Sequence, residues 1–180
     1  MRRRKILWQL MPAFLLTVLI ALTAITSYAL SAIRDFYEEQ ARVELKNRAW
    51  LLENAVLSLM DPFDEGGLKS FCAEAGRKGN TRVTVIDPKG KVVGDSHEDA
   101  DMMDNHIDRP EIKEAMERQV GYSIRKSQTL KENMVYVAIP LEKEGRVLGV
   151  LRTSLTVTHR EQTLGTILTK IVVGGLIIAF

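Results

Sequence analysis

The sequence contains a single cysteine, Cys72, so one chain cannot form an internal disulfide. Its basic and acidic residues nearly balance, at 25 and 23, which leaves a net charge of +2 and no clustered basic stripe of the kind that binds nucleic acid. It also lacks a glycine-rich phosphate-binding stretch and any serine, histidine and aspartate arrangement in a recognisable catalytic context. These features argue against a nucleic-acid-binding protein, a nucleotide-dependent enzyme and an independent exported hydrolase.

The chain does have a long apolar run near its N-terminus. Residues 6–33 include no charged residue, and four basic residues at 2–5 precede them. A helix of about 20 apolar residues spans a bilayer, and the basic flank is expected to stay inside. We therefore predict a cytoplasmic tip at 1–5, a transmembrane helix at 6–30 and an exported chain after it. A cleaved signal peptide is the alternative, but the run exceeds the usual apolar core of about 7–15 residues.

Helical periodicity continues after this segment. Apolar residues step by four and three until the helix breaker Asp61–Pro62, at Leu45, Ala49, Leu52, Val56 and Leu59. This stripe can pack against the chain's own domain, against a second copy, or against both. A second helix is expected at about 67–78, where Cys72 lies on the apolar face and is expected to be buried.

From Thr81 the pattern changes to short β-branched segments. A helix interrupts them, with Asp108 as its expected N-cap and Pro110 and Glu111 in its first turn. The expected strands are Arg82–Ile86, Lys91–Gly94, Gly121–Ser127, Asn133–Leu141 and Arg146–Leu155. This order predicts an α+β domain with one antiparallel five-stranded sheet flanked by helices. The exported domain is then 31–165, with helices at about 31–60 and 67–78 and the sheet at about 81–155.

A second apolar run begins at Ile167 and continues to Phe180. It is shorter than a full membrane span. We expect residues 166–180 to be the start of a second transmembrane helix, cut off part-way, so that the chain is an N-terminal fragment of a longer protein.

Several stretches carry a family resemblance. They are Arg82–Ser96, Asn105–His106, Arg109–Ile112, Arg125–Ser127 with Thr129, and Tyr136–Pro140. Over about Thr81–Leu155 the chain resembles the extracytoplasmic PAS-like (Cache) domain of bacterial two-component sensor histidine kinases, most closely the phosphate-regulon, PhoR-like type. The resemblance implies the bacterial inner membrane, a cytoplasmic N-terminus and a homodimer. It also implies a response regulator as partner of the full-length parent.

The chain departs from this family in what it lacks. No HAMP linker, phospho-accepting helix or ATP-binding domain is present, and the residues after His159 lack the proline of the phospho-accepting box. We therefore expect this chain to sense and transmit without phosphorylating, and to need no cofactor, whereas ATP and Mg²⁺ would belong to the missing kinase core. The alternatives are the input region of a chemotaxis receptor or cyclic-dinucleotide enzyme, and a membrane-anchored binding protein.

The resemblance places a ligand pocket between the sheet and the loop with its short helix. The candidate residues are Asn105, His106, Arg109, Arg125, Ser127, Tyr136 and Arg152. Arginine forks match carboxylate or phosphate, so the small ligand would be anionic if Arg125 and Arg152 point inward. Four acidic-loop residues are weak metal candidates, namely Asp95, His97, Asp99 and Asp101. Their spacing matches no defined metal loop, so a solvated acidic loop is the preferred interpretation.

Overall fold

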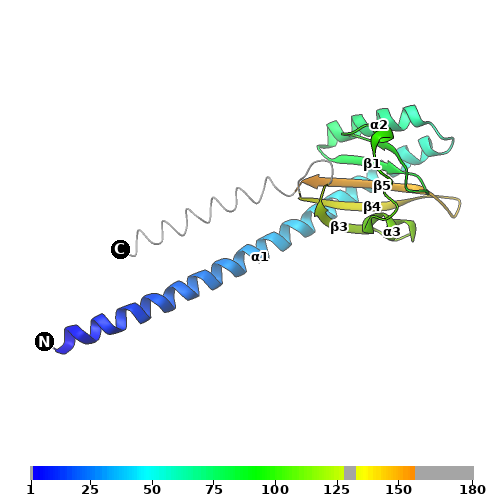
Figure 1. Cartoon of the computed structure of the whole chain (residues 1–180). Coiled ribbons are helices and arrows are strands. Elements are labelled where there is room, and N and C mark those ends of the chain that lie inside the picture. Colours follow the sequence, from blue (N-terminus) through cyan, green and yellow to red (C-terminus); the bar gives the residue numbers. More distant parts are fainter. Residues whose placement is uncertain (1, 128–132, 157–180) are drawn as a thin grey trace. The chain divides into compact units, whose positions relative to one another are not determined.

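The structure is a computed structural model that describes residues 2–127 and 133–156. The chain divides into two compact units, Met1–Gln40 and Ala41–Phe180. Helix α1 (Arg2–Met60) forms the first unit and contributes its C-terminal part to the second (Figure 1). The predicted second transmembrane segment and His159 lie outside the described residues.

The first unit carries exposed apolar side chains. They include Phe14, Leu16, Ile20, Leu22 and Ile25. By length and composition α1 is the one described helix able to cross a membrane, with a mean hydropathy of 2.0 in its most apolar window. Helix α1 includes residues 6–30, and the transmembrane role of that segment stays a prediction.

The second unit is built on one antiparallel sheet of order β2-β1-β5-β4-β3. Its strands are β1 (Arg82–Ile86), β2 (Val92–Asp95), β3 (Gly121–Lys126), β4 (Asn133–Lys143) and β5 (Arg146–Thr156). The predicted α+β class and five strands are confirmed. Only two residues, Glu144 and Gly145, join β4 to β5. Both have positive φ, as the tight hairpin requires.

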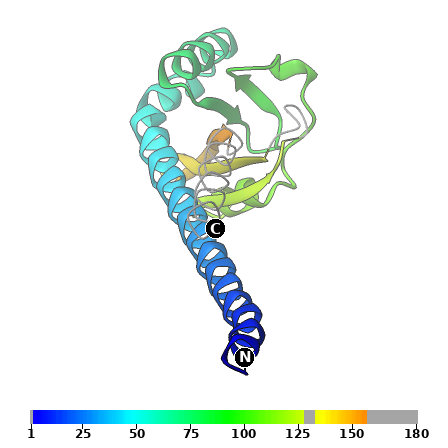
Figure 2. The ribbon, with the colours of Figure 1, turned by 90° about the vertical axis from the view of Figure 1, so that its left-hand side faces the viewer.

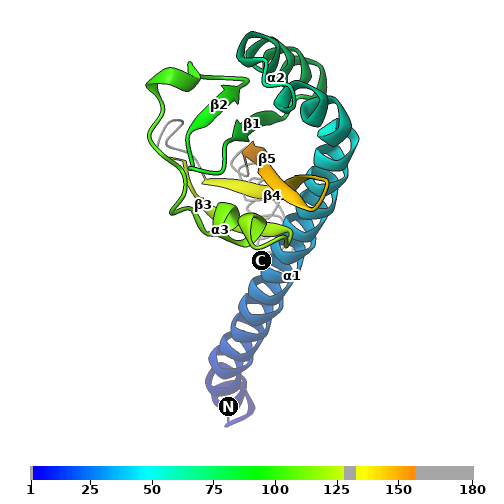
Figure 3. The same cartoon turned by 90° about the vertical axis from the view of Figure 1, so that its right-hand side faces the viewer.

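One face of the sheet is covered by the end of α1 and by α2 (Glu65–Gly79), and α2 lies against β1 and β2 (Figures 2 and 3). The stripe predicted along α1 points into this core, since Leu45, Ala49 and Val56 are fully buried. Of the packings left open by the sequence, the one against the chain's own domain is confirmed, whereas packing against a second copy stays a prediction. Cys72 is buried in the same core, and burial, with the charge of Asp95, raises its thiol pKa to about 12.

The opposite face carries helix α3 (Pro110–Met116) and the loop that contains the short helix η1 (Ala100–Met102). Arg109, not Asp108, is the N-cap of α3, and its side chain makes no capping hydrogen bond. The predicted cap is therefore wrong. Asp108 forms an exposed ion pair with Lys113 instead, and Pro110 occupies the first turn, where its missing N–H costs nothing.

Candidate functional site

A pocket of about 200 Å³ lies between the α3 face of the sheet and the η1 loop. Its lining is mostly charged: Arg82, Glu98, Asp99, Met102, Met103, Asp104, His106, Arg109, Arg125, Ser127, Tyr136 and Arg152. The volume is below the range of about 300–1,000 Å³ of sites for drug-sized ligands, which limits the ligand to a smaller molecule, and the arginines supply converging polar groups. It is a candidate ligand site.

Strand register brings the arginines of three strands to this face. Arg152 on β5 lies opposite Thr84 on β1 and Ala138 on β4. Arg125 on β3 lies opposite Met134, two residues before Tyr136 on β4. Side chains of directly opposed residues share a face of the sheet. Arg125 and Arg152 therefore both point inward, which satisfies the condition under which the sequence predicted an anionic ligand.

The carboxylate of Glu111 on α3 offsets part of the positive charge of Arg125 and Arg152. Its Oε1 accepts a hydrogen bond from Arg125 Nη2 at 2.8 Å and one from Arg152 Nη1 at 3.4 Å. Glu111 is fully buried, which opposes ionisation, but the Arg125 hydrogen bond and the two guanidinium charges outweigh burial and hold the pKa of its carboxyl below the usual value. The carboxylate is therefore ionised and fixes the two guanidinium groups.

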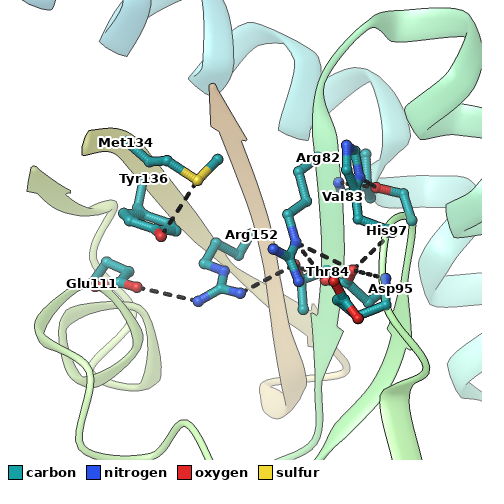
Figure 4. A network of polar contacts seen from close by, with 11 residues as sticks. Arg82, Val83, Thr84, Asp95, His97, Glu111, Met134, Tyr136 and Arg152 are labelled. Atoms are coloured by element: carbon teal, nitrogen blue, oxygen red, sulfur yellow. Dashed lines mark hydrogen bonds and ion pairs between the residues drawn. The ribbon is translucent and has the colours of Figure 1, made fainter. Parts of the chain in front are cut away.

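A second buried carboxylate, Asp95, holds the other end of the network (Figure 4). Arg82 Nε donates to both of its oxygens, at 3.1 and 3.2 Å, and Thr84 Oγ1 donates at 2.7 Å. Arg152 Nη2 donates in turn to Thr84 Oγ1 at 3.2 Å, which makes the network continuous. Burial opposes ionisation of Asp95, but Arg82 and Thr84 keep its pKa below the usual value.

Tyr136 supports both central arginines through its aromatic ring. The guanidinium carbon of Arg125 lies 4.1 Å from the ring centroid and that of Arg152 lies 5.1 Å from it. Guanidinium groups at such distances are attracted by the negative face of the ring. The tyrosine thus holds two cations together that would otherwise repel each other.

Several buried nitrogens of the lining residues have no hydrogen-bond partner in residues 2–127 and 133–156. They are Arg82 Nη2, Arg125 Nε, Arg152 Nε and His106 Nδ1. Arg82, His106 and Arg152 are each less than 7% exposed. Buried polar groups are normally satisfied, so the residues that line the pocket retain hydrogen-bonding capacity that the described residues do not use.

His106 and Asn105 fix the loop that closes the pocket. His106 N donates to Gly90 O and Asn105 Nδ2 donates to Lys89 O, both at 2.8 Å, which anchors the loop on the β1–β2 turn. Burial and then the charges of Arg152, Arg109 and Arg125 lower the pKa of His106 to about 3. The imidazole is therefore neutral.

The outer side of the pocket is acidic. Glu98, Asp99 and Asp104, which we call the acidic rim, are exposed and line the opening together with Met102 and Met103. The pocket is thus positive at the sheet and negative at the loop.

Six of the seven candidate site residues line this pocket, and Asn105 is the exception because its side chain bonds to Lys89 O and to Ile107 N. Arg82 was not predicted from the sequence to line the site. It was also not predicted that Asp95 pairs with Arg82, or that Glu111 pairs with Arg125 and Arg152. The alternation of Arg82 and Thr84 with Val83 and Val85 was the available indication, since it gives β1 one polar and one apolar face.

The four weak metal candidates do not converge. Asp95 pairs with Arg82, Asp101 with Lys69 at 2.6 Å, and Asp99 caps η1. Within the described ranges no group of three or more histidine, cysteine, aspartate or glutamate side chains is placed to hold a metal ion.

The sheet order, the helices on its two faces and the charged pocket define an α+β domain with a candidate ligand site. The Single Cache-like family model matches residues 63–156, and the chain belongs to this family. No curated protein matches the chain.

Solved structures with this fold include sensor domains of several receptors. The ligand-binding domain of Campylobacter jejuni chemoreceptor Tlp3, in complex with 4-methylisoleucine, matches with a TM-score of 0.53 and 16% identity over 70% of this chain and 53% of that one. The E. coli DcuS sensor domain matches with a TM-score of 0.56 and 12% identity over 71% of this chain and 97% of that one. The V. cholerae histidine kinase DctB sensor domain has a TM-score of 0.49 and 18% identity, over 74% and 52%. The chain thus spans about half the length of Tlp3 and of DctB as solved.

Proposed function

We propose that this chain is the ligand-sensing and signal-transmitting part of a transmembrane receptor, and that its parent is a two-component sensor histidine kinase of the PhoR-like type. The observation that carries the proposal is the pocket, where arginines of three strands line one face of the sheet while α1 packs on the other. Membership of the Single Cache-like family supports sensing. The motifs Asn105–His106 and Arg109–Ile112 support the kinase class.

The pocket favours a small ligand with a carboxylate or similar anionic group. Asp95 and Glu111 offset two of the four arginines that line the pocket, Arg82, Arg109, Arg125 and Arg152, so positive charge is left for a ligand to neutralise. The acidic rim favours a ligand that also carries a cationic group. The Tlp3 domain is in complex with 4-methylisoleucine, an amino acid, so α-amino acids are the first class to test here.

The second candidate is the input region of a chemotaxis receptor, because Tlp3 is a chemoreceptor of the same fold. The two classes differ in the output segment that the parent carries after its sensory region. A HAMP segment followed by a phospho-accepting histidine box indicates the kinase, which would require ATP and Mg²⁺ and act on a response regulator. A long heptad-rich coiled coil indicates the chemoreceptor.

The test of ligand sensing uses the full-length parent in membrane vesicles. Twenty L-amino acids, succinate and inorganic phosphate are the probes, and autophosphorylation is the readout. We expect at least one probe to change the rate, and Arg125→Ala and Arg152→Ala each to raise the half-maximal concentration at least tenfold. Arg146→Ala is the matched control, since Arg146 is an exposed arginine of the same strand as Arg152. Folded variants with the wild-type dose response would refute the pocket assignment.

A further inference from the structure

Leu45 and Arg48 on α1 make hydrogen bonds to the sheet or to the segment that leads into it, and Arg42 on the same helix lies over the Tyr122 ring of β3. Thr153 Oγ1 on β5 donates to Leu45 O at 3.0 Å, and the contact is buried. Arg48 Nη1 donates to Gly79 O at 2.7 Å and also to Thr81 Oγ1, just before β1. We call these hydrogen bonds the α1 anchors.

Each α1 anchor lies one residue from a pocket arginine. Thr153 follows Arg152, and Thr81 precedes Arg82. Side chains alternate along a strand, so Arg152 points into the pocket while Thr153 points to α1. The two strands are hydrogen-bonded neighbours, with Arg82 opposite Ser154.

Both anchors reach the same turn of α1. Leu45 and Arg48 are three residues apart, which places them on one side of the helix. The arginines that would bind the ligand are therefore joined, through one peptide unit each, to a single point on the helix that leads back toward the N-terminal apolar segment.

We propose that Thr153 and Arg48 are positioning residues that transmit occupancy of the pocket to α1. This inference rests on the proposed function, because it assumes that a ligand engages Arg82 or Arg152. Apolar contacts are non-directional, whereas a hydrogen bond fixes donor against acceptor. Thr153 is fully buried, so its hydroxyl has no access to solvent as a replacement partner. A shift of β5 therefore either moves α1 or leaves a buried hydroxyl unpaired, which is costly.

The hydrogen bond from the Thr153 hydroxyl to Leu45 O can be tested separately from the shape of the Thr153 side chain. Thr153→Val keeps the shape of the side chain and removes the hydroxyl, whereas Thr153→Ser keeps the hydroxyl. Arg48→Met removes the other anchor. Lys46→Met is the matched control on the same helix, because the Lys46 ammonium lies over the Trp50 ring of that helix, 5.0 Å from its centroid.

The readout is the disulfide cross-linking rate of Asn47→Cys, an exposed position on α1, in the full-length parent in membranes. The pocket is perturbed in two ways: by the mixture of twenty L-amino acids at 1 mM each, and by Arg152→Gln without any added ligand. We expect one or both perturbations to change the rate at least threefold. Thr153→Val and Arg48→Met should each reduce that change at least fivefold, while Thr153→Ser and Lys46→Met keep it within twofold.

Binding is followed separately by the thermal shift that the amino acids produce. A coupling role predicts that Thr153→Val keeps this shift while losing the cross-linking response. If no amino acid shifts the wild-type melting temperature, the ligand class is wrong, but the Arg152→Gln arm still tests the anchors. The inference is overturned if neither perturbation changes the wild-type rate, or if folded Thr153→Val and Arg48→Met retain the full response.

Discussion

Arg152 Nη1 on β5 lies 3.4 Å from Glu111 Oε1 on α3, and both side chains are buried. The same carboxylate oxygen lies 2.8 Å from Arg125. One helix residue thus holds two strands' arginines in place before any ligand arrives. Since the arginines are pre-positioned, a ligand need not bear the entropic cost of ordering them.

Replacing Glu111 by glutamine should destabilise the domain. The change leaves two guanidinium groups without their buried counter-charge, and breaking a buried ion pair costs about 3–5 kcal/mol of unfolding free energy. Urea unfolding of the wild type and the variant measures the difference. Asp108→Asn is the control, because that carboxylate is 88% exposed and its ion pair should contribute about 1 kcal/mol or less. A loss below about 1 kcal/mol for Glu111→Gln would show that the pair does not stabilise the fold.

Gly121→Ala should also perturb the site. A Cβ at Gly121 would lie 1.9 Å from the carbonyl oxygen of Glu111, so β3 and α3 would have to separate. Overpacking of this kind typically costs about 1–3 kcal/mol, and it should weaken the Arg125–Glu111 contact. Gly79→Ala is the control, since nothing lies within 4 Å of a Cβ there. Equal melting temperatures for the two variants would contradict the close approach.

The stability of the domain should fall between pH 7 and pH 5 because of His106. Its folded pKa is about 3, whereas an unfolded histidine titrates near 6.5, so the unfolded chain takes up a proton that the folded one excludes. The loss over this interval is about 2 kcal/mol. Asp95 and Glu111 have lowered pKa values, so their contribution is present at higher pH and is lost only below about pH 4.5.

His106→Gln separates this effect from other titrations. Glutamine stays neutral, so urea unfolding of the variant should show a flatter pH dependence from pH 7 to pH 5. An unchanged dependence would mean that His106 is not the group responsible.

Much of the fold could be predicted because it depends on local patterns. The β-branched run Arg82–Ile86 and the helix breaker at Asp61–Pro62 mark elements that end where expected. The α1 stripe was visible too, but its partner was not, since apolar periodicity predicts a buried face and not what covers it.

The centre of the site was harder to predict because it depends on pairing across long sequence distances. Arg152 meets Glu111 across 41 residues and Thr84 across 68. Glu111 can also be explained locally, as an acidic residue in the first turn of a helix. Asp95 can likewise be explained as one of several acidic residues in a loop. Only strand register shows that both are the buried partners of arginines.

We predict a cytoplasmic N-terminus and an extracytoplasmic domain from the basic residues 2–5. A reporter fused after Asn80 in the full-length parent should be active only on the extracytoplasmic side, since the apolar run at 6–30 would place Asn80 outside. A fusion within residues 2–5 is the control for the cytoplasmic side. Cytoplasmic activity at Asn80 would exclude an extracytoplasmic sensor.

We predict that the parent is a homodimer and that its two copies pair through the outer face of α1. The inward stripe is occupied by the domain's own core, whereas Phe36, Val43 and Trp50 recur every seven residues and are 59%, 42% and 49% exposed. A seven-residue apolar repeat is typical of paired parallel helices, and a common membrane would keep two copies parallel.

Cysteines scanned from Val43 to Asn54 in the full-length parent should therefore cross-link with helical periodicity. We expect maxima at Val43, Asn47, Trp50 and Asn54, and minima at Leu45, Ala49 and Leu52. Cys72 can remain in the background, because burial raises its thiol pKa to about 12 and leaves little reactive thiolate. The inward positions are the internal control for access. Maxima at Leu45 and Ala49 would mean that the packing of α1 on its own sheet is replaced by packing on the second copy, and a flat profile would argue against pairing through α1.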